Sequence, residues 1–416
     1  MATTTDPDTR IVTLDILRGV AVMGILAMNA LAFAMPQQAY NNPSVYGGTE
    51  GADLWAWALS FVFVDGKMRG LFSLLFGASM LLVIERADAA NGNGGSVHAR
   101  RMLWLLVFGL AHYFLIWWGD ILVTYAVIGL IAYGFTGKSP KALKGWAIGL
   151  FIASIVLTGI FFMSPLMLQA AATMPGADPQ MVEQWRQVEA DIGGTPAVIA
   201  ADVARHQGSW LEIVEYKLIH GWFFPIIGML MFGLETLAFM LLGMWGLKSG
   251  FLTGAREPGR YAKVAAISFL VSVPVYAWLG WITYRSGFDV ATTMAAGMAG
   301  GALVRPVMTI GYAALIILVT RHGGRLVDRI AAAGRAAFTN YIGTSILMTT
   351  IFYGYGLGLY GEVGRAELWL FILGVWALML IWSKPWLDRY RYGPFEWLWR
   401  TLARGQVQPM RKIAAA

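Results

Sequence analysis

A histidine and an aspartate on either side of a tryptophan pair are the residues of this chain best suited to proton transfer. His112 precedes Trp117-Trp118 in an apolar stretch, and Asp120 directly follows Gly119. An imidazole takes up and returns a proton near neutral pH, and a carboxylate can orient it. Eight helical residues span about 12 Å, so contact requires the chain to turn at Gly119. We predict His112 as a general base oriented by Asp120; the alternative is a hydrogen bond that only joins two helices.

Three further charges fall within five positions of the longest apolar stretch. Asp65, Lys67 and Arg69 alternate there with Gly66 and Met68. A charge in the membrane interior costs at least about 2.5 kcal/mol, so these side chains are expected to line a hydrated cavity or to pair across the bundle. Lys67 is a candidate catalytic donor to an oxyanion. The structural alternative is a salt bridge from Asp65 to Lys67 or Arg69, although a buried pair alone is a poor source of stability.

Polar residues in other apolar stretches extend the expected cavity. Glu235 stands in the middle of 222–247, and Asn340 and Tyr341 lie near the start of 336–360. Asn340 is a second candidate oxyanion donor, and its alternative role is to join helices. The predicted lining of the substrate cavity is Asp15, Asp65, Arg69, Glu235, Asn340 and Tyr341.

Arginines at the ends of apolar stretches could bind the phosphates of a cofactor. Arg18 follows Asp15 by three positions, so both share one face of a helix. A planar guanidinium can bind phosphate oxygens in pairs. Arg18 is therefore a candidate phosphate ligand on the cytoplasmic side. The alternative is that Asp15 is a carboxylate at a helix start and that Arg18 reaches the lipid headgroups.

The elements that hold these residues are transmembrane helices. The chain has 416 residues, of which 57% are hydrophobic and 13% charged, and it has no cysteine. Soluble domains carry about 25% charged residues, so an ordinary soluble enzyme is excluded, as are disulfides, zinc thiolate sites and a cysteine nucleophile. The net charge of +7 comes from residues between apolar runs, which argues against a nucleic-acid partner. No spacing of metal ligands is evident, and no metal is expected.

The expected fold is an all-α bundle of about ten membrane-spanning helices. A span needs about 20 mostly apolar residues because its backbone must satisfy its own hydrogen bonds. The second stretch is too long for one plain span and is either a tilted helix or a short re-entrant piece followed by a helix. The stretches are Ile16–Met35, Leu54–Ile84, Met102–Trp118, Ile121–Thr136, Trp146–Met163, Trp222–Leu247, Val264–Tyr284, Leu303–Thr320, Ala336–Tyr360 and Leu368–Trp382.

The basic residues predict how these spans are oriented. Lys and Arg favour short cytoplasmic loops. The odd-numbered connections hold 23 of them, against 5 in the even-numbered connections. Both termini are therefore expected in the cytoplasm, and the first span is retained because no cleavage site follows it. The lipid bilayer is the expected partner.

Three regions are expected along the chain. Residues 1–163 form an N-terminal helical bundle, 164–221 a large outer loop, and 222–416 a C-terminal bundle with a tail. The loop carries spaced apolar residues among acids, which predicts amphipathic helices near the outer surface and a lid. The tail from Ser383 is rich in aromatic and basic residues and is expected to anchor at the membrane interface.

Several motifs, in their order, resemble the YeiB family of bacterial inner-membrane proteins. This family is placed with the transmembrane acyltransferases that include heparan-α-glucosaminide N-acetyltransferase. The sequence departs at Met68, where the family commonly has Phe. The motifs are Leu14-Asp15-Ile16-Leu17-Arg18-Gly19; Gly66-Lys67-Met68 with Leu71–Gly77; Gly119-Asp120-Ile121-Leu122 with Tyr125-Ala126; Gly334-Arg335 with Thr339-Asn340-Tyr341; and Gly393–Arg400.

The resemblance implies transfer of an acyl group from cytoplasmic acyl-CoA, with acetyl-CoA the expected donor, to an acceptor on the periplasmic side. His112 is matched to the membrane-embedded histidine of the heparan acetyltransferases by its chemistry and surroundings. For the implied reaction, the arginines expected to bind the coenzyme A phosphates at the inner face are Arg18, Arg100, Arg101 and Arg335. A secondary transporter is the main alternative, since buried charges also serve proton relays and solute sites. A non-catalytic assembly or lipid-binding protein is the third. The acceptor and the oligomeric state, with a homodimer among the options, stay open.

Overall fold

The computed structural model describes residues 11–412, which form an all-α bundle without a β-strand. A 3₁₀ turn spans Gln37–Tyr40, and π-helical segments span His112–Ile116 and Ala295–Gly300. The α-helices are α1 (Val12–Ala34), α2 (Gly51–Phe63), α3 (Lys67–Asn91), α4 (Gly94–Ala111), α5 (Leu122–Tyr133), α6 (Pro140–Ala172), α7 (Pro179–Gly193), α8 (Pro196–His206), α9 (Trp210–His220), α10 (Phe224–Lys248), α11 (Pro258–Arg285), α12 (Val290–Met294), α13 (Gly301–Thr320), α14 (Arg325–Arg335), α15 (Ala337–Phe352), α16 (Leu368–Arg389) and α17 (Pro394–Arg404).

Eight helical stretches within residues 11–412 are long and apolar enough to cross a membrane, so the chain has the features of a multi-pass membrane protein. The all-α prediction is confirmed. Two of the ten predicted spans contain shorter helices, since α5 has 12 residues and α15 has 16. The count of ten stays a prediction.

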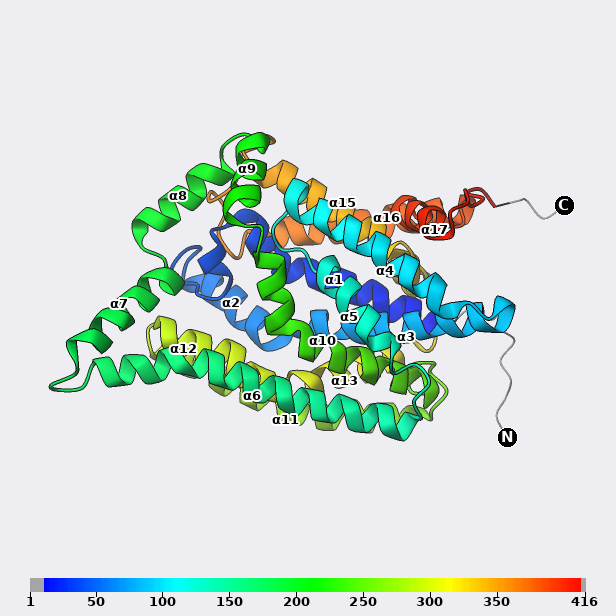
Figure 1. The fold of residues 1–416 in the computed structure, drawn as a ribbon, viewed down its shortest axis with the longest axis horizontal. Helices are drawn as coiled ribbons and strands as arrows, with labels where there is room; N and C mark the ends of the chain where they lie inside the picture. Colours follow the sequence, from blue (N-terminus) through cyan, green and yellow to red (C-terminus); the bar gives the residue numbers. More distant parts are fainter. Residues whose placement is uncertain (1–10, 413–416) are drawn as a thin grey trace.

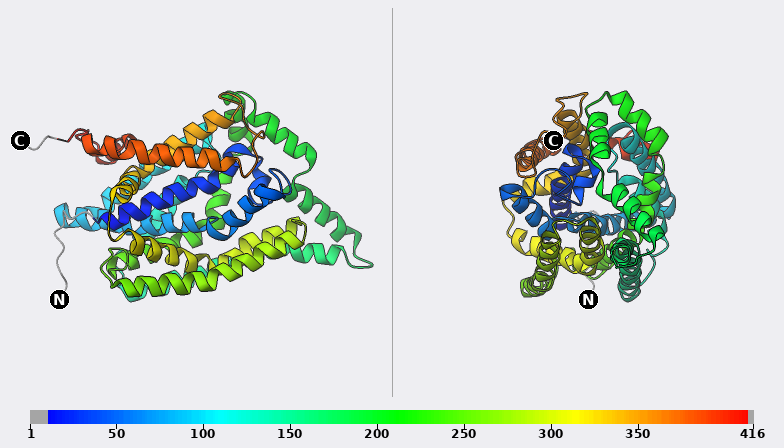
Figure 2. Two further views of the ribbon diagram at one scale, coloured as in Figure 1. Left: turned by 180° about the vertical axis from the view of Figure 1, so that it is seen from behind. Right: turned by 90° about the vertical axis from the view of Figure 1, so that its left-hand side faces the viewer.

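The long helices run roughly along one axis, and the loop helices α7, α8 and α9 gather at one end of it (Figure 1). The start of α1 and all of α17 lie at the opposite end (Figures 1 and 2). The first and last described helices are therefore on the same side of the bundle. That this side faces the cytoplasm rests on the charge pattern alone.

The over-long second stretch is a broken helix. α2 ends at Phe63 and α3 begins at Lys67, with Gly66 at a φ of 70° between them. This left-handed conformation favours glycine, which has no Cβ to clash. The break places Asp65 between the two helices, where irregular backbone at membrane depth needs a protein or water lining.

The bundle packs around α1, which lies in the centre when viewed along the long axis (Figure 2). Glycines allow neighbouring helices to approach closely, as expected for membrane helix pairs. A Cβ added to Gly243 of α10 would lie 1.8 Å from the Leu74 carbonyl oxygen of α3, and one added to Gly77 would lie 2.1 Å from the Met240 carbonyl oxygen. The α3–α10 pair therefore depends on both glycines.

The change Gly243→Ala should destabilise the protein by about 1–3 kcal/mol, because overpacking moves the α3 backbone. Thermal unfolding of the purified protein in detergent would show a lower midpoint. Gly228→Ala on the same helix is the matched control, since no described heavy atom lies within 4 Å of its added Cβ. Equal midpoints for the two variants would contradict this account of the helix crossing.

Candidate active site

His112 and Asp120 are in direct contact inside the bundle. The Nδ1 atom of His112 lies 2.7 Å from Oδ2 of Asp120, and both side chains are at most 1% exposed. The other Asp120 oxygen accepts a hydrogen bond of 2.9 Å from the amide of Val123 at the start of α5. This carboxylate therefore closes the N-terminus of α5 and holds the imidazole at the same time.

A change of helix type brings the two residues together. α4 ends at Ala111, and the next turn, beginning at His112, is π-helical. The amide of Trp117 donates to the His112 carbonyl oxygen at 2.8 Å, after which the chain leaves the helix. The turn at Gly119, which contact between His112 and Asp120 requires, is therefore present. π-Helical turns of this kind are common at functional sites.

The Nε2 atom of His112 is buried and has no hydrogen-bond partner among residues 11–412. Buried polar atoms nearly always have partners, so an unpaired one needs an explanation. With Nδ1 held by the carboxylate, the neutral imidazole presents a lone pair at Nε2. Tyr341 and Trp117 flank the ring, with centroids 5.1 Å and 6.2 Å away. Nε2 of His112 is therefore able to accept a proton from a bound ligand.

Asn29 of α1 was not singled out from the sequence. It is half-buried and lies one helical turn before Phe33, so the two share a face of α1. Phe33 stacks on Trp117 with ring centroids 4.1 Å apart, so this face is turned toward the dyad. An asparagine in the middle of an apolar span was the signal that could have identified it.

Helix α9 covers the π-helical segment. Lys217 donates to the Tyr113 carbonyl oxygen at 3.0 Å, and the Tyr113 hydroxyl donates to the Gly221 carbonyl oxygen at 2.6 Å. Trp210 also donates from its indole to the Leu115 carbonyl oxygen at 2.8 Å. The loop predicted as a lid is therefore in contact with the turn that carries His112.

The other intramembrane charges form a separate cluster. Glu235 accepts from Arg69 at 2.5 Å and from Arg305 at 2.7 Å. Arg69 therefore pairs across the bundle, which is one of the two expected outcomes, and its partner is Glu235 and not Asp65, which the structural alternative required. Arg305 was not among the predicted site residues, because its partner lies 70 positions away.

Lys67 belongs to this second cluster and not to the dyad. Its side chain is fully buried, its Nζ donates to the Phe61 carbonyl oxygen at 2.5 Å and lies 3.4 Å from the Tyr276 ring centroid. Asn340 is also occupied elsewhere: its amide donates to the Ala333 carbonyl oxygen at 3.0 Å, and its oxygen accepts from Trp382 at 2.9 Å. The structure therefore does not bring either predicted oxyanion donor to His112.

Two tyrosines border the two clusters. The hydroxyl of Tyr125 of α5 lies 2.8 Å from the Ser73 hydroxyl and 3.4 Å from the Arg69 carbonyl oxygen. Tyr341 of α15 lies beside His112, with ring centroids 5.1 Å apart. Within residues 11–412, no group of three or more His, Asp or Glu side chains is arranged to hold a metal ion.

Arginines from three helices gather near the end of the bundle where the described chain starts and finishes. Arg18 contacts Asp15 at 3.2 Å and the Ser79 hydroxyl at 2.5 Å. Arg101 lies 4.1 Å from the Trp399 ring centroid and interacts with the charges of Arg18, Arg400 and Arg404. Burial lowers the pKa of Arg400, and its arginine neighbours add to that effect.

The two α17 arginines in this cluster were missed, because the tail was interpreted as an interfacial anchor. Arg100 is exposed, and Arg335 donates to the Arg391 carbonyl oxygen at 3.5 Å. Of the four predicted phosphate ligands, Arg18 and Arg101 therefore lie in one cluster with Arg400 and Arg404.

Comparison with known proteins gives full-length relatives. The chain is 32% identical over 412 residues to the uncharacterized protein YeiB of Escherichia coli (strain K12), covering 96% of this chain and 98% of that protein. The chain belongs to the YeiB family. An uncharacterized YxaH of Bacillus subtilis (strain 168) is 31% identical over 97% of this chain and 96% of its own. The family described as "Protein of unknown function (DUF418)" matches residues 247–406. No solved structure matches this YeiB-family chain.

The YeiB motifs pack against one another in space. A Cβ added to Gly334 would lie 1.9 Å from the Asp15 carbonyl oxygen, and one added to Gly19 would lie 2.1 Å from the Ile330 carbonyl oxygen. Glu396 of the last motif accepts hydrogen bonds from the amide of Phe338 at 2.6 Å and from the Thr339 hydroxyl at 2.5 Å. The motifs thus fix α14, α15 and α17 against α1 and against each other.

Docking of α9 on the π-helical turn should depend on pH. Burial lowers the pKa of Lys217 to about 7 from its ordinary value of 10.5. Between pH 7 and pH 10.5, Lys217 is therefore more protonated in the undocked helix than in the docked one. Docking of α9 is thus strengthened as the pH rises from about 7 to 10. Hydrogen exchange of amides 210–220, corrected for intrinsic rates, should slow over this range.

The change Lys217→Met should abolish that pH dependence. Tyr113→Phe is the matched control, because it removes the other contact with α9, to Gly221, and leaves the titrating amine in place. A Lys217→Met protein with the original pH profile would show that another group titrates.

Proposed function

We propose that this protein is a transmembrane acyltransferase of a bacterial plasma membrane. It would move an acyl group from acyl-CoA on the cytoplasmic side to a hydroxyl or amine acceptor reached from the periplasmic side. The observation that carries the proposal is the buried His112–Asp120 pair with a free Nε2 atom. Its relation to the wider acyltransferase superfamily is part of the proposal.

The dyad suits attack on a thioester. Nε2 of His112 removes the proton of the acceptor as its oxygen or nitrogen bonds to the thioester carbonyl carbon. The tetrahedral intermediate then expels the coenzyme A thiolate, and the imidazolium returns the proton to sulfur. Asp120 stabilises the imidazolium and keeps it oriented. Tyr341, whose ring lies beside His112, would be the donor for the oxyanion in place of Lys67 and Asn340. Asn29, on the same α1 face as Phe33, is a second candidate.

The arginine cluster suits the nucleotide end of the donor. Several guanidiniums with few acids between them favour a ligand that carries multiple phosphates. Arg101 and His112 lie on the same helical rod, eleven residues or ~16 Å apart. An extended pantetheine arm can cover that distance, so the thioester would reach the dyad while the phosphates stay at the arginines.

A secondary transporter remains the competing function, favoured by the Glu235 cluster. Charges paired at membrane depth are typical of proton and solute pathways. Counterflow of labelled solute in liposomes, without consumption of acyl-CoA, would support the transporter. Hydrolysis of acetyl-CoA or acyl labelling of an acceptor by the purified protein would support the transferase.

The change His112→Ala should reduce acyl transfer by at least about 100-fold, the contribution typical of a general base. Asp120→Asn should reduce it as well, because the imidazole loses its orienting charge. Labelled acetyl-CoA and membrane extracts as the acceptor source would provide the assay. His98→Ala is a control, since Nε2 of His98 donates to the Gly129 carbonyl oxygen at 3.0 Å and takes no part in the hydrogen bonds of the dyad. Full turnover in folded His112→Ala protein would refute the base.

The change Arg101→Ala should raise the KM for acyl-CoA about tenfold, because one charge-assisted phosphate contact is lost. Arg100→Ala is the matched control, with the same charge change at the exposed neighbouring position. Initial rates at varied acetyl-CoA concentration would measure both. Equal effects of the two variants would mean that the net charge of this end, and not a defined site, sets the affinity.

A further inference from the structure

Two adjoining cavities lead toward Asp65 from the end of the bundle that holds the loop helices. The larger cavity, of about 330 Å³, borders α7, whose Asp191 and Ile192 line it. The smaller one, of about 30 Å³, lies between α1, α2 and α16 and is lined by Asp65. Asn41 and Thr293 line both cavities. The shared residues therefore place the two cavities next to each other, between the loop helices and the break that separates α2 from α3.

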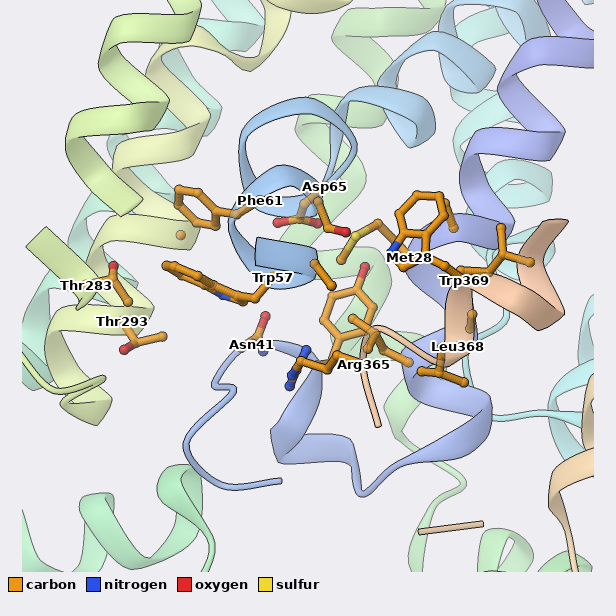
Figure 3. A pocket seen from close by; sticks show the side chains of 18 of the residues that line it. Met28, Asn41, Trp57, Phe61, Asp65, Thr283, Thr293, Arg365, Leu368 and Trp369 are labelled. Atoms are coloured by element: carbon orange, nitrogen blue, oxygen red, sulfur yellow. The ribbon is translucent and has the colours of Figure 1, made fainter. Parts of the chain in front are cut away.

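The smaller cavity has a size that suits water. A cavity needs about 10–15 Å³ to hold one water molecule, so a volume of about 30 Å³ has room for roughly two. In the view of Figure 3, Asp65 lies toward one end of this cavity, and Asn41 and Arg365 lie toward the other. Water molecules, and not a larger ligand, are therefore its expected occupants.

The lining of the smaller cavity contains polar atoms that the protein leaves unpaired. The Thr293 hydroxyl and the Nε atom of Arg365 are buried and lack a hydrogen-bond partner among residues 11–412. The rest of the Arg365 guanidinium is held in place, because it donates to the carbonyl oxygens of Ala39 and Tyr46. Buried polar atoms nearly always have partners, and ordered water supplies them where the protein does not. Water in this cavity would satisfy both atoms.

Asp65 is the acid that such water would reach. It is only partly buried, although it lies within the longest apolar stretch of the chain. A charged side chain that faces lipid is unfavourable, so its exposed part is expected to face the cavity that it lines. Burial raises the pKa of Tyr40, and the Asp65 carboxylate adds to that rise, so the phenol is neutral and donates a hydrogen bond to Asp65. The carboxylate is thus held at the inner end of the two cavities.

The inner end of the smaller cavity adjoins the Glu235 cluster. Asp65 and Lys67 flank Gly66, and a Cβ added to Gly66 would collide with the guanidinium of Arg305. Arg305 in turn pairs with Glu235 at 2.7 Å. A proton that binds to Asp65 would therefore remove a negative charge beside this cluster.

We propose that Asp65 is a proton-binding site, which water reaches from the side of the loop helices through the two cavities. A hydronium ion would transfer its proton to a carboxylate oxygen of Asp65, which leaves a water molecule and a neutral carboxyl group. A metal cation is disfavoured, because the positively charged Arg365 lines the same cavity. The proposal does not rest on acyl transfer, because it concerns proton binding alone.

The passage can be tested with single cysteines, because the chain has none of its own. The probe is Ag⁺, a small cation that binds thiolates, added outside sealed proteoliposomes that expose the loop helices. Ser60→Cys places a thiol in the smaller cavity, and Thr293→Cys places one where the two cavities adjoin. Ser272→Cys on α11 is the matched control, since this serine is fully buried and lines neither cavity.

We expect Ag⁺ to block the thiols at positions 60 and 293 and to leave the one at position 272 free. The free thiols would be counted with a maleimide after the protein has been denatured. A thiol at position 60 that stays as free as the one at position 272 would overturn the proposal, because no water-sized cation would then reach the depth of Asp65.

Proton binding would be measured by infrared difference spectroscopy on the same vesicles while the external pH is lowered from about 7 to about 4, across the ordinary range of an aspartate. We expect the carbonyl band of a protonated carboxyl group to appear, and Asp65→Asn to remove one component of it. Asp388→Asn is the matched control, since this exposed carboxylate near the end of α16 lies at the opposite end of the bundle and should not sense the external pH. Identical spectra for the parent and Asp65→Asn would overturn the proposal.

Discussion

A polar group inside a hydrocarbon layer must find its partner within the protein, and this constraint shapes the interior of the bundle. Glu235 pairs with the guanidinium groups of Arg69 and Arg305. Asn340 is hydrogen-bonded to α14 on one side and to α16 on the other. Lys67 uses a backbone carbonyl and an aromatic face. Nε2 of His112 is one of eight buried side-chain atoms that lack a hydrogen-bond partner among residues 11–412, and it is the one imidazole nitrogen among them. It is informative because the other nitrogen of the same ring is held by a buried carboxylate.

The central helix α1 divides the polar interior. One side of it meets the arginine cluster and the dyad, through Arg18 and Phe33. The opposite side lines a pocket between α1, α2 and α16, through Ala27 and Leu31. The Glu235 cluster reaches α5, whose Tyr125 hydroxyl lies 2.8 Å from the Ser73 hydroxyl and 3.4 Å from the Arg69 carbonyl oxygen. Polar groups therefore lie on both sides of α1.

Local patterns predicted the helices and the dyad, whereas contacts distant in sequence escaped prediction. Apolar length identified the stretches around α1, α10 and α16, and the requirement for a turn at Gly119 was evident from helix geometry. The pairing of Glu235 with Arg305 could not be predicted, because nothing in the sequence around either of these two residues indicates that α10 and α13 meet there. The α17 arginines were missed for the same reason. A basic, aromatic tail is fully explained as an anchor at the membrane interface, and the sequence does not indicate that α17 docks against α4.

The unequal lengths of α4 and α5 explain why the dyad is buried. Tyr133 at the end of α5 stacks near His98 in the first turns of α4, so the two helices are aligned at that end. α5 has only 12 residues and begins at Leu122, where the amide of Val123 lies near Gly109. The chain between Ile116 and Leu122 must therefore cross within the depth of the bundle. Such irregular backbone is tolerated there only under protein cover, which Phe33 and α9 supply, and that cover also keeps water from the imidazole.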